Sequence, residues 1–417
     1  MDVKSCFDSI PQQEVMLMLR GLLSESRYQI GKHAELKSVE GTRPTYNSER
    51  PSVRFPFTGR PSQGGSGLSD SVLDVVAQMK SRTVFVDLGD LRHWDARSLL
   101  KLLQEHLEQN VVKIDKRFFR KRLGIPQGSV LSSLLCNFFY GEFEKNCLAF
   151  LQPGESLLLR LIDDFLLVTT NQGHARRFAR VMLEGNPKYG IVVNAQKSLS
   201  NFAININRVK IPRLQGEEKL PYCGIAIDVK SLEVSKFRGT KDPTVANGLT
   251  IELSRRLGER FHRKVLHSLK LQMTTLLLDT NLNSEYRVLS NLYQIFMEAG
   301  MKMYRYVRGL PKKKRPNEGM VTETWKGLAS LATKMTRGKR RSRSVEEYLC
   351  SISPTQMNWL AAAGLEHVMA RKQTGYQTVL KWARGVMGQC EGGMKMDSRK
   401  LQEMREQGER DFRRYRY

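Results

Sequence analysis

The most informative segment of the chain is Leu159-Arg-Leu-Ile-Asp163-Asp164-Phe-Leu-Leu-Val168. Two short apolar runs meet at a pair of carboxylates, which predicts a buried hairpin over 157–169 with both acids at its turn. Each carboxylate loses hydration there and repels its neighbour, whereas a purely structural turn would favour Asn-Gly or Asp-Gly. A divalent cation is the simplest compensation, because Mg²⁺ binds one or two carboxylates together with substrate phosphates. Taken alone, the motif also fits an acidic turn on the surface.

A third acid lies near the start of the chain, in Met1-Asp2-Val3-Lys4-Ser5-Cys6-Phe7-Asp8. Asp2 precedes a helix that we expect to begin near Pro11. Acids drawn from two strand ends are what two-metal phosphoryl transfer requires, because one metal activates a primer 3′-hydroxyl and the other neutralises the leaving pyrophosphate. The protein contributes position and electric field to such a reaction.

The third motif is Gly124-Ile-Pro-Gln127-Gly128-Ser129, which opens a mostly apolar helix expected over 131–150. Its backbone N–H groups, its amide side chain and its glycines suit the close approach of a nucleotide or a template base. By itself it could be only a tight junction between a loop and a helix. In the order Asp2, Gln127-Gly128, Asp163-Asp164, the three motifs together indicate a nucleotide polymerase.

The charge balance favours a polyanionic partner. Lys and Arg number 68 against 42 Asp and Glu in 417 residues, which gives a net charge of +26. Phosphate backbones bind such proteins by releasing counterions, although a merely basic surface is the plainer alternative. The six cysteines show no zinc-ligand spacing, which predicts reduced thiols. No apolar run is long enough to span a bilayer, so we expect no membrane partner.

The remaining pattern predicts an α+β chain whose second half is helical. We expect an irregular polar connection over 28–68, a strand over 83–87, an extended segment over 111–119 and a strand over 190–194. Residues 394–417 are expected to form a solvated helix or a frayed tail. Further helices are expected over 72–79, 98–107, 176–183, 249–278, 285–307, 322–335 and 354–385.

The order of the three motifs resembles the reverse-transcriptase palm, and the details resemble telomerase reverse transcriptases. Leu-Ile-Asp-Asp stands where retroviral enzymes usually have Tyr-x-Asp-Asp, and a long insertion separates the first two motifs. Further segments that resemble telomerase motifs are Tyr189-Gly-Ile-Val-Val-Asn194 with Lys197, Leu220-Pro-Tyr-Cys-Gly224, 276–283 and 357–382.

The resemblance implies a reverse-transcriptase palm, an antiparallel sheet with helices, together with a partial fingers insertion and an all-helical thumb. The family's N-terminal domains would precede Met1, so the resemblance also implies an N-terminally truncated form. The implied divisions are a first palm motif over 1–26, a fingers insertion over 27–123, the palm over 124–235, a helical thumb over 236–386 and a charged tail over 387–417.

The resemblance also implies roles for individual residues. Asp2, Asp163 and Asp164 would be catalytic and, with Val3, would hold two Mg²⁺ ions. Phe7 would exclude a 2′-hydroxyl or serve as a core aromatic, and Lys197 would approach the triphosphate or stay solvated. Gln127 and Gly128 would contact the nucleotide, with the template as the alternative for Gln127. A primer grip would comprise Tyr222, Cys223 and Gly224, with Cys223 also explicable by packing. Contacts to the nucleic-acid backbone, or nuclear targeting, would fall to Lys312, Lys313, Lys314, Arg315, Lys339, Arg340 and Arg341.

The implied activity is RNA-templated synthesis from dNTPs of telomeric repeats at chromosome 3′ ends. Its partners would be a telomerase RNA template, a telomeric single-stranded DNA primer and accessory telomerase proteins, in the nucleus at the telomere. Two alternatives stay open: a reverse transcriptase of an intron or retroelement, and a non-catalytic RNA–DNA-binding fragment whose basic residues act with aromatics such as Phe118 and Phe119.

Overall fold

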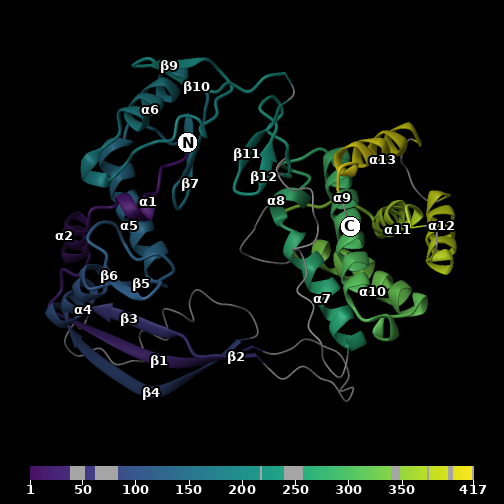
Figure 1. Ribbon diagram of the computed structural model, residues 1–417, viewed down its shortest axis with the longest axis horizontal. Helices are drawn as coiled ribbons and strands as arrows, with labels where there is room; N and C mark the ends of the chain where they lie inside the picture. Colours follow the sequence, from purple (N-terminus) through teal and green to yellow (C-terminus); the bar gives the residue numbers. More distant parts are fainter. Residues whose placement is uncertain are drawn as a thin grey trace. The chain divides into compact units, whose positions relative to one another are not determined.

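The computed structural model describes residues 1–37, 52–61, 83–216, 218–238, 257–339, 348–372, 375–392 and 398–415. The chain forms two compact units, one of Met1–Leu199 with Ala203–Pro212 and one of Ser200–Phe202 with Arg213–Tyr417. Each unit has its own hydrophobic core. Helices and antiparallel sheets are both present, which confirms the α+β prediction (Figure 1).

The core of the first unit is organised by helix α5 (Ser132–Cys147). Its buried residues Leu135, Phe139 and Phe143 recur at helical spacing and therefore share one face. Phe165 of strand β8 (Asp164–Thr169) packs on this face, with its ring centroid 6.4 Å from that of Phe143. Around it lie α1 (Cys6–Ser9), α2 (Gln12–Leu22), α4 (Ala96–Glu108) and α6 (Gln172–Glu184).

The hairpin predicted at the paired acids is confirmed, but it is not fully buried, because Leu157, Leu159 and Leu161 on one face of its first strand are exposed. Strand β7 (Ser156–Leu161) pairs antiparallel with β8 (Asp164–Thr169), and Leu161 faces Asp164 at the turn end. The expected strand at 190–194 is reduced to isolated bridges, because Ile191 and Val193 pair with single residues. This part of the unit also contains η1 (Pro187–Tyr189) and the small hairpin of β9 (Ile204–Ile206) and β10 (Val209–Ile211).

The prediction of an irregular connection over 28–68 is wrong for its described parts. Strand β1 (Arg27–Lys37) is central in an antiparallel sheet with β2 (Ser52–Arg54), β3 (Phe57–Pro61) and β4 (Thr83–Asp95). The pattern was hidden because the buried positions of β1 include Gln29, Gly31 and His33 rather than large apolar residues. The helix expected over 72–79 lies outside the described residues.

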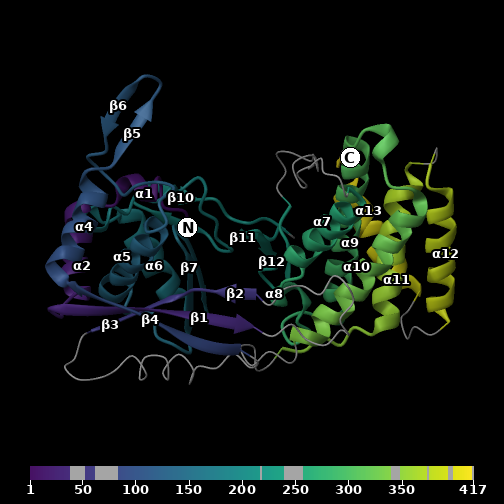
Figure 2. The ribbon, with the colours of Figure 1, turned by 90° about the horizontal axis from the view of Figure 1, so that it is seen from below.

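Other predicted elements of the first unit are confirmed with adjusted ends. The strand expected over 83–87 is the start of β4, and the helix expected over 98–107 is α4. The extended segment over 111–119 is a hairpin of β5 (Val111–Ile114) and β6 (Arg117–Arg120), which projects from its unit in Figure 2.

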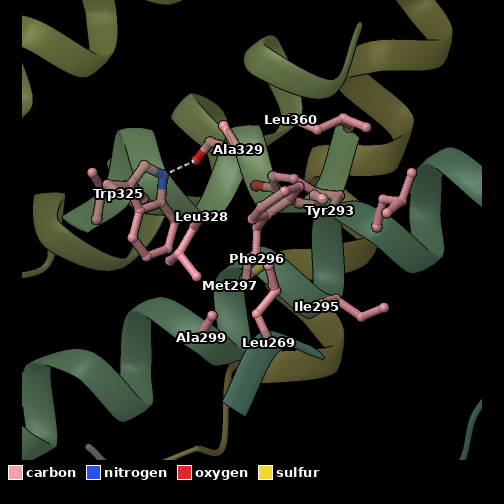
Figure 3. Close-up of a cluster of buried hydrophobic side chains, with 14 of the residues drawn as sticks. Leu269, Tyr293, Ile295, Phe296, Met297, Ala299, Trp325, Leu328, Ala329 and Leu360 are labelled. Carbon is pink, nitrogen blue, oxygen red and sulfur yellow. Dashed lines mark hydrogen bonds between the residues drawn. The ribbon is translucent and has the colours of Figure 1, made fainter. Parts of the chain in front are cut away.

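The second unit begins with the antiparallel sheet of β11 (Leu220–Tyr222), β12 (Ile225–Ile227) and β13 (Val234–Lys236), and then becomes helical. Helix α9 (Glu285–Gly309) runs through its core (Figure 3). The Phe296 ring of α9 lies 6.3 Å from that of Trp325, whose Nε1 donates a 2.8 Å hydrogen bond to the carbonyl of Ala361. The other helical segments are α7 (Leu257–Gln272), α8 (Thr275–Leu278), η3 (Lys312–Lys314), α10 (Glu318–Lys339), α11 (Pro354–Ala370) and α12 (Gln377–Glu391).

The C-terminal segment is a helix, as one of the two expected alternatives had it, but it is not wholly solvated. It forms α13 (Ser398–Phe412), which buries Met404 and Phe412 in the core of the second unit. At Gly408 a Cβ atom would lie 2.6 Å from Cε1 of Tyr293, so the helix packs closely here. The charged residues occupy the other faces, which concealed the narrow buried stripe. Among the described residues, no helix combines the length and apolarity needed to cross a bilayer.

Candidate active site

The first four residues lie between two segments of the first unit. The N–H of Val3 donates to the carbonyl of Asp163 at 3.2 Å, and the N–H of Phe165 donates to that of Met1 at 2.9 Å. On the other edge, the N–H of Asn194 donates to the carbonyl of Asp2 at 2.9 Å. An antiparallel bridge thus pairs Asp2 directly with Asp164. The backbone therefore brings together the acidic positions that are 161 or more residues apart in sequence.

The turn that carries the paired acids has an unusual backbone. Ile162 adopts φ 59°, a left-handed conformation that costs a β-branched residue free energy. The surrounding structure holds it there, because the Ile162 side chain packs against the core and its carbonyl accepts a 3.3 Å hydrogen bond from Arg160. Such strain persists where neighbouring contacts over-determine a turn, as they commonly do at functional sites.

The electrostatics of the site centre on Asp164. Burial raises the pKa of this carboxyl, and repulsion from Asp163 and Asp2 raises it further. The N-terminal ammonium opposes this rise in pKa, and so does Lys197, whose Nζ lies 3.6 Å from Oδ2 of Asp2. Negative charge thus acts on Asp164 from both Asp163 and Asp2, and a cation would relieve the repulsion.

The residues suit a hard divalent cation in their chemistry, because carboxylate oxygens are the donors that Mg²⁺ prefers. The arrangement of the side chains meets this requirement only in part. Among the described residues, no three Asp, Glu, His or Cys side chains are arranged as a ligand group. The backbone brings Asp2 and Asp164 into register, while the assignment of Asp2, Val3, Asp163 and Asp164 as ligands stays a prediction.

The Pro-Gln-Gly loop is fastened to α1. Gly124 has φ 74°, and a Cβ atom there would lie 2.3 Å from the Phe7 carbonyl oxygen, so only glycine fits. The N–H of Ile125 donates to the same carbonyl at 2.6 Å. The amide of Gln12 donates to the Gly124 carbonyl at 2.9 Å. The loop therefore lies against the helix that directly follows Asp2.

Asp8 connects the loop to the end of the β5–β6 hairpin. Its Oδ2 accepts a 3.0 Å hydrogen bond from Nε2 of Gln127, and its Oδ1 lies 2.6 Å from Nζ of Lys121. Lys121 also donates to the Ile125 carbonyl at 2.9 Å. Gln127 and Gly128 are both exposed. The amide that we expect to contact a nucleotide is thus held by Asp8 in this structure.

Two further predicted residues lie beside these motifs without their roles being tested. Phe7 is half-buried and packs against the core of the first unit, which is compatible with both interpretations of it. Lys197 is held by the turn at Asn194, whose carbonyl accepts its N–H at 3.1 Å. Its role toward a triphosphate stays a prediction.

The predicted primer grip belongs to the second unit. Tyr222 ends β11, and Cys223 and Gly224 form the two-residue turn to β12 with φ 47° and 82°. A positive φ at both positions is the requirement of a type I′ hairpin turn. The carbonyl of Gly224 also accepts a 2.9 Å hydrogen bond from Phe237. The turn geometry explains the Cys-Gly sequence, and its role toward a primer stays a prediction.

The predicted backbone-binding cations are also in the second unit. Lys312, Lys313 and Lys314 form the exposed turn η3. Arg315 is partly structural, because its guanidinium donates to the carbonyls of Leu310 and Arg308 at 3.1 and 3.0 Å. Lys339 ends α10. Arg340 and Arg341 lie outside the described residues.

The sequence interpretation missed residues that position the site. Arg160 reaches from β7 to Glu144 and Asn137 on α5 and supports the turn at Ile162. The sequence pattern that could have indicated Arg160 is a single arginine within an otherwise apolar strand. The link from Asp8 to Gln127 had none, because the two residues are separated by 119 positions.

Comparisons with known proteins cover most of the chain. A family model described as reverse transcriptase (RNA-dependent DNA polymerase) matches residues 89–227, and one described as telomerase reverse transcriptase, C-terminal extension, matches residues 259–384. The telomerase reverse transcriptase of Rattus norvegicus is 29% identical over 390 residues, covering 91% of this chain and 34% of that protein. That of Oryza sativa subsp. japonica is 25% identical over 420 residues, covering 95% and 32%.

The chain thus spans about a third of the length of these curated relatives. A solved structure of apo telomerase from Candida tropicalis matches with a TM-score of 0.37 and 17% identity, over 92% of this chain and 52% of that one. That structural similarity is too low to support an argument of its own. The two family models and the long alignments support the telomerase reverse transcriptase family, and the chain is similar to the C-terminal portion of its members.

Proposed function

We propose that this chain carries the catalytic centre of an RNA-directed DNA polymerase that adds telomeric repeats to chromosome 3′ ends. The observation that carries the proposal is the antiparallel bridge between Asp2 and Asp164, which brings the first acidic motif to the paired-acid turn. The fastening of the Pro-Gln-Gly loop to α1 supports it, because α1 begins four residues after Asp2.

In this proposal Asp2, Val3, Asp163 and Asp164 hold two Mg²⁺ ions. When bound, such ions activate the primer 3′-hydroxyl and stabilise charge on the leaving pyrophosphate. The residues of the chain bind and orient the reactants: Gln127 and Gly128 contact the incoming dNTP, and Phe7 lies under its sugar. Lys197 neutralises negative charge beside Asp2, a role that its 3.6 Å approach to Oδ2 supports.

The proposed partners follow from the family and the charge. The excess of Lys and Arg suits a telomerase RNA template and a telomeric single-stranded DNA primer. Tyr222, Cys223 and Gly224 would steer the primer end, and the cations at 312–315 and 339–341 would contact the nucleic-acid backbone. Accessory telomerase proteins and a location in the nucleus at the telomere complete the proposal.

The test is primer extension by the chain assembled with its telomerase RNA, in the presence of Mg²⁺ and dNTPs. Asp163→Asn removes one carboxylate with little change in volume, and we expect it to abolish extension. Glu184→Gln removes an exposed carboxylate from α6 of the same unit and serves as the matched control. Undiminished extension by Asp163→Asn would refute the catalytic assignment.

A non-catalytic RNA–DNA-binding fragment is the second candidate. It is favoured by one observation, that no metal-ligand group is arranged among the side chains of the described residues. It predicts binding of an RNA–DNA hybrid that weakens with salt, without dNTP incorporation. A reverse transcriptase of an intron or retroelement would instead copy any supplied RNA equally well.

A further inference from the structure

The β5–β6 hairpin exposes an unusual set of side chains. Every residue of both strands is exposed to solvent, including Phe118 at 70% and Phe119 at 50%. An isolated two-stranded hairpin is at best marginally stable in water. Large apolar side chains that remain exposed on such a ribbon commonly mark an interaction surface.

The pairing of the strands distributes these side chains over both faces. Lys113 pairs with Phe118, and Val112 pairs with Phe119. Because side chains alternate along a strand, the two phenylalanines lie on opposite faces of the ribbon. The ammonium of Lys113 lies 5.6 Å from the centroid of the Phe118 ring. Neither face is therefore a purely apolar surface of the kind that packs on a protein core.

Charge identifies the partner. Residues 111–122 contain six basic residues and one acidic residue. Exposed aromatic rings set among cations suit single-stranded nucleic acid, because bases stack on the rings while the cations contact phosphates. A protein partner of this surface would have to be strongly acidic.

Contacts at the base of the hairpin determine where a bound single strand of nucleic acid would lie. The N–H of Lys121 donates to the carbonyl of Asn110 at 3.0 Å, which closes the hairpin. The side chain of Lys121 binds Asp8, which also holds Gln127 of the Pro-Gln-Gly loop. The hairpin is thus directly followed by the Pro-Gln-Gly loop, which is fastened to α1.

We propose that the β5–β6 hairpin binds single-stranded nucleic acid, with Phe118 and Phe119 as stacking platforms and Lys113, Arg117 and Arg120 as phosphate contacts. The location of the bound strand, unpaired and next to the polymerase site, rests on the proposed function. The binding itself needs no synthesis and is tested separately.

The experiment measures equilibrium binding of labelled single-stranded RNA and DNA of about 12 nucleotides to the full chain by fluorescence anisotropy. Phe118→Ala combined with Phe119→Ala is expected to weaken binding at least about fivefold, the smallest effect of losing one stack. Phe57→Ala, which truncates an exposed phenylalanine of β3 at 64% exposure, is the matched control and is expected to bind as the parent does. The RNA and DNA arms show which strand the hairpin prefers, and a preference for either supports the proposal.

The salt dependence tests the cations. Lys113→Gln combined with Arg120→Gln is expected to reduce the slope of log K against log salt by about 1.4 for a single strand. The control Arg176→Gln combined with Arg180→Gln removes the same charge from the exposed face of α6. Equal effects of the two pairs would overturn the proposal in favour of a general basic surface.

A direct readout completes the test. Photocrosslinking with 5-iodouridine in the oligonucleotide is expected to label Phe118 or Phe119, and labelling only outside 111–122 would overturn the inference. If the chain self-associates, hairpin variants that abolish this association but leave nucleic-acid affinity unchanged would overturn the inference in favour of a protein contact. Hairpin-dependent binding by a chain that fails to extend primers would refute the proposed function and leave this inference standing.

Discussion

The substitution Gly124→Ala tests how tightly the Pro-Gln-Gly loop is held against α1. The new Cβ would lie 2.3 Å from the Phe7 carbonyl oxygen and 2.6 Å from Cα of Asp8. Both are backbone atoms, so relief requires the loop or α1 to move. Overpacking of this kind costs about 1–3 kcal/mol, and the left-handed φ of 74° adds about 1–2 kcal/mol for a residue with a Cβ.

The same loop offers a matched control. Gly128 has φ 82°, and a Cβ atom there would meet no atom within 4 Å. Gly128→Ala therefore incurs only the backbone cost of about 1–2 kcal/mol. The difference between the two variants isolates the close approach of the loop to Phe7 and Asp8, which we expect to be about 1–3 kcal/mol.

The measurement is urea denaturation of both variants, followed by circular dichroism and by tryptophan fluorescence. The first unit and the second unit have separate cores, so the transitions are fitted separately where they separate. Gly124→Ala should be the less stable variant in the transition that belongs to the first unit. Equal losses from the two substitutions would refute the packing of the loop on α1.

Three further predictions concern charge, the C-terminal helix and the loop. Because the raised pKa of Asp164 means that folding favours its protonated form, its ionisation destabilises the metal-free fold as pH rises through that pKa. Asp164→Asn should therefore raise the stability of the metal-free protein at pH 7. This gain should vanish as pH falls toward 3.8, the ordinary pKa of an aspartate. A difference in melting temperature that does not change with pH would contradict this prediction. Phe412→Ala should cost the second unit about 3–5 kcal/mol, because the ring is fully buried, whereas exposed Arg413→Ala should change stability by less than about 0.5 kcal/mol in urea denaturation. Asp8→Ala should raise the KM for dNTP about two- to tenfold, because it releases Gln127. Asp8→Asn keeps an acceptor for the Gln127 amide and should have a smaller effect. Equal effects of the two substitutions on KM would argue that this hydrogen bond is unimportant.

The parts of the fold that could be predicted are those in which burial follows a simple period. The apolar stripe of α9 and the two apolar runs around Asp163-Asp164 gave elements close to the observed ones. Strand β1 could not be recognised, because Gln29 and His33 occupy buried positions that usually hold apolar residues. Helix α13 was hidden for the opposite reason: only a narrow stripe with Met404 and Phe412 is buried in a segment crowded with charge.

The candidate site likewise has residues that could be predicted from the sequence and residues that could not. The acids and the Pro-Gln-Gly loop were readable from residue type, because a carboxylate pair in an apolar hairpin demands compensation. Their partners were not readable. Asp8 binds Gln127 and Lys121 across more than a hundred residues, and Arg160 supports the Ile162 carbonyl from within its own hairpin.

The residue types establish the chemistry available to this protein: three acidic positions, the Pro-Gln-Gly loop and a large excess of positive charge. The order of those motifs also indicated a reverse-transcriptase palm, and the details of their sequences indicated the telomerase family. Only the tertiary structure decided that Asp2 pairs with Asp164 and that the loop is fastened to α1. Residue types act through local conformational preference and hydration. The two contacts depend instead on backbone hydrogen bonds between segments that are distant in the chain, and no local pattern specifies which segments will pair.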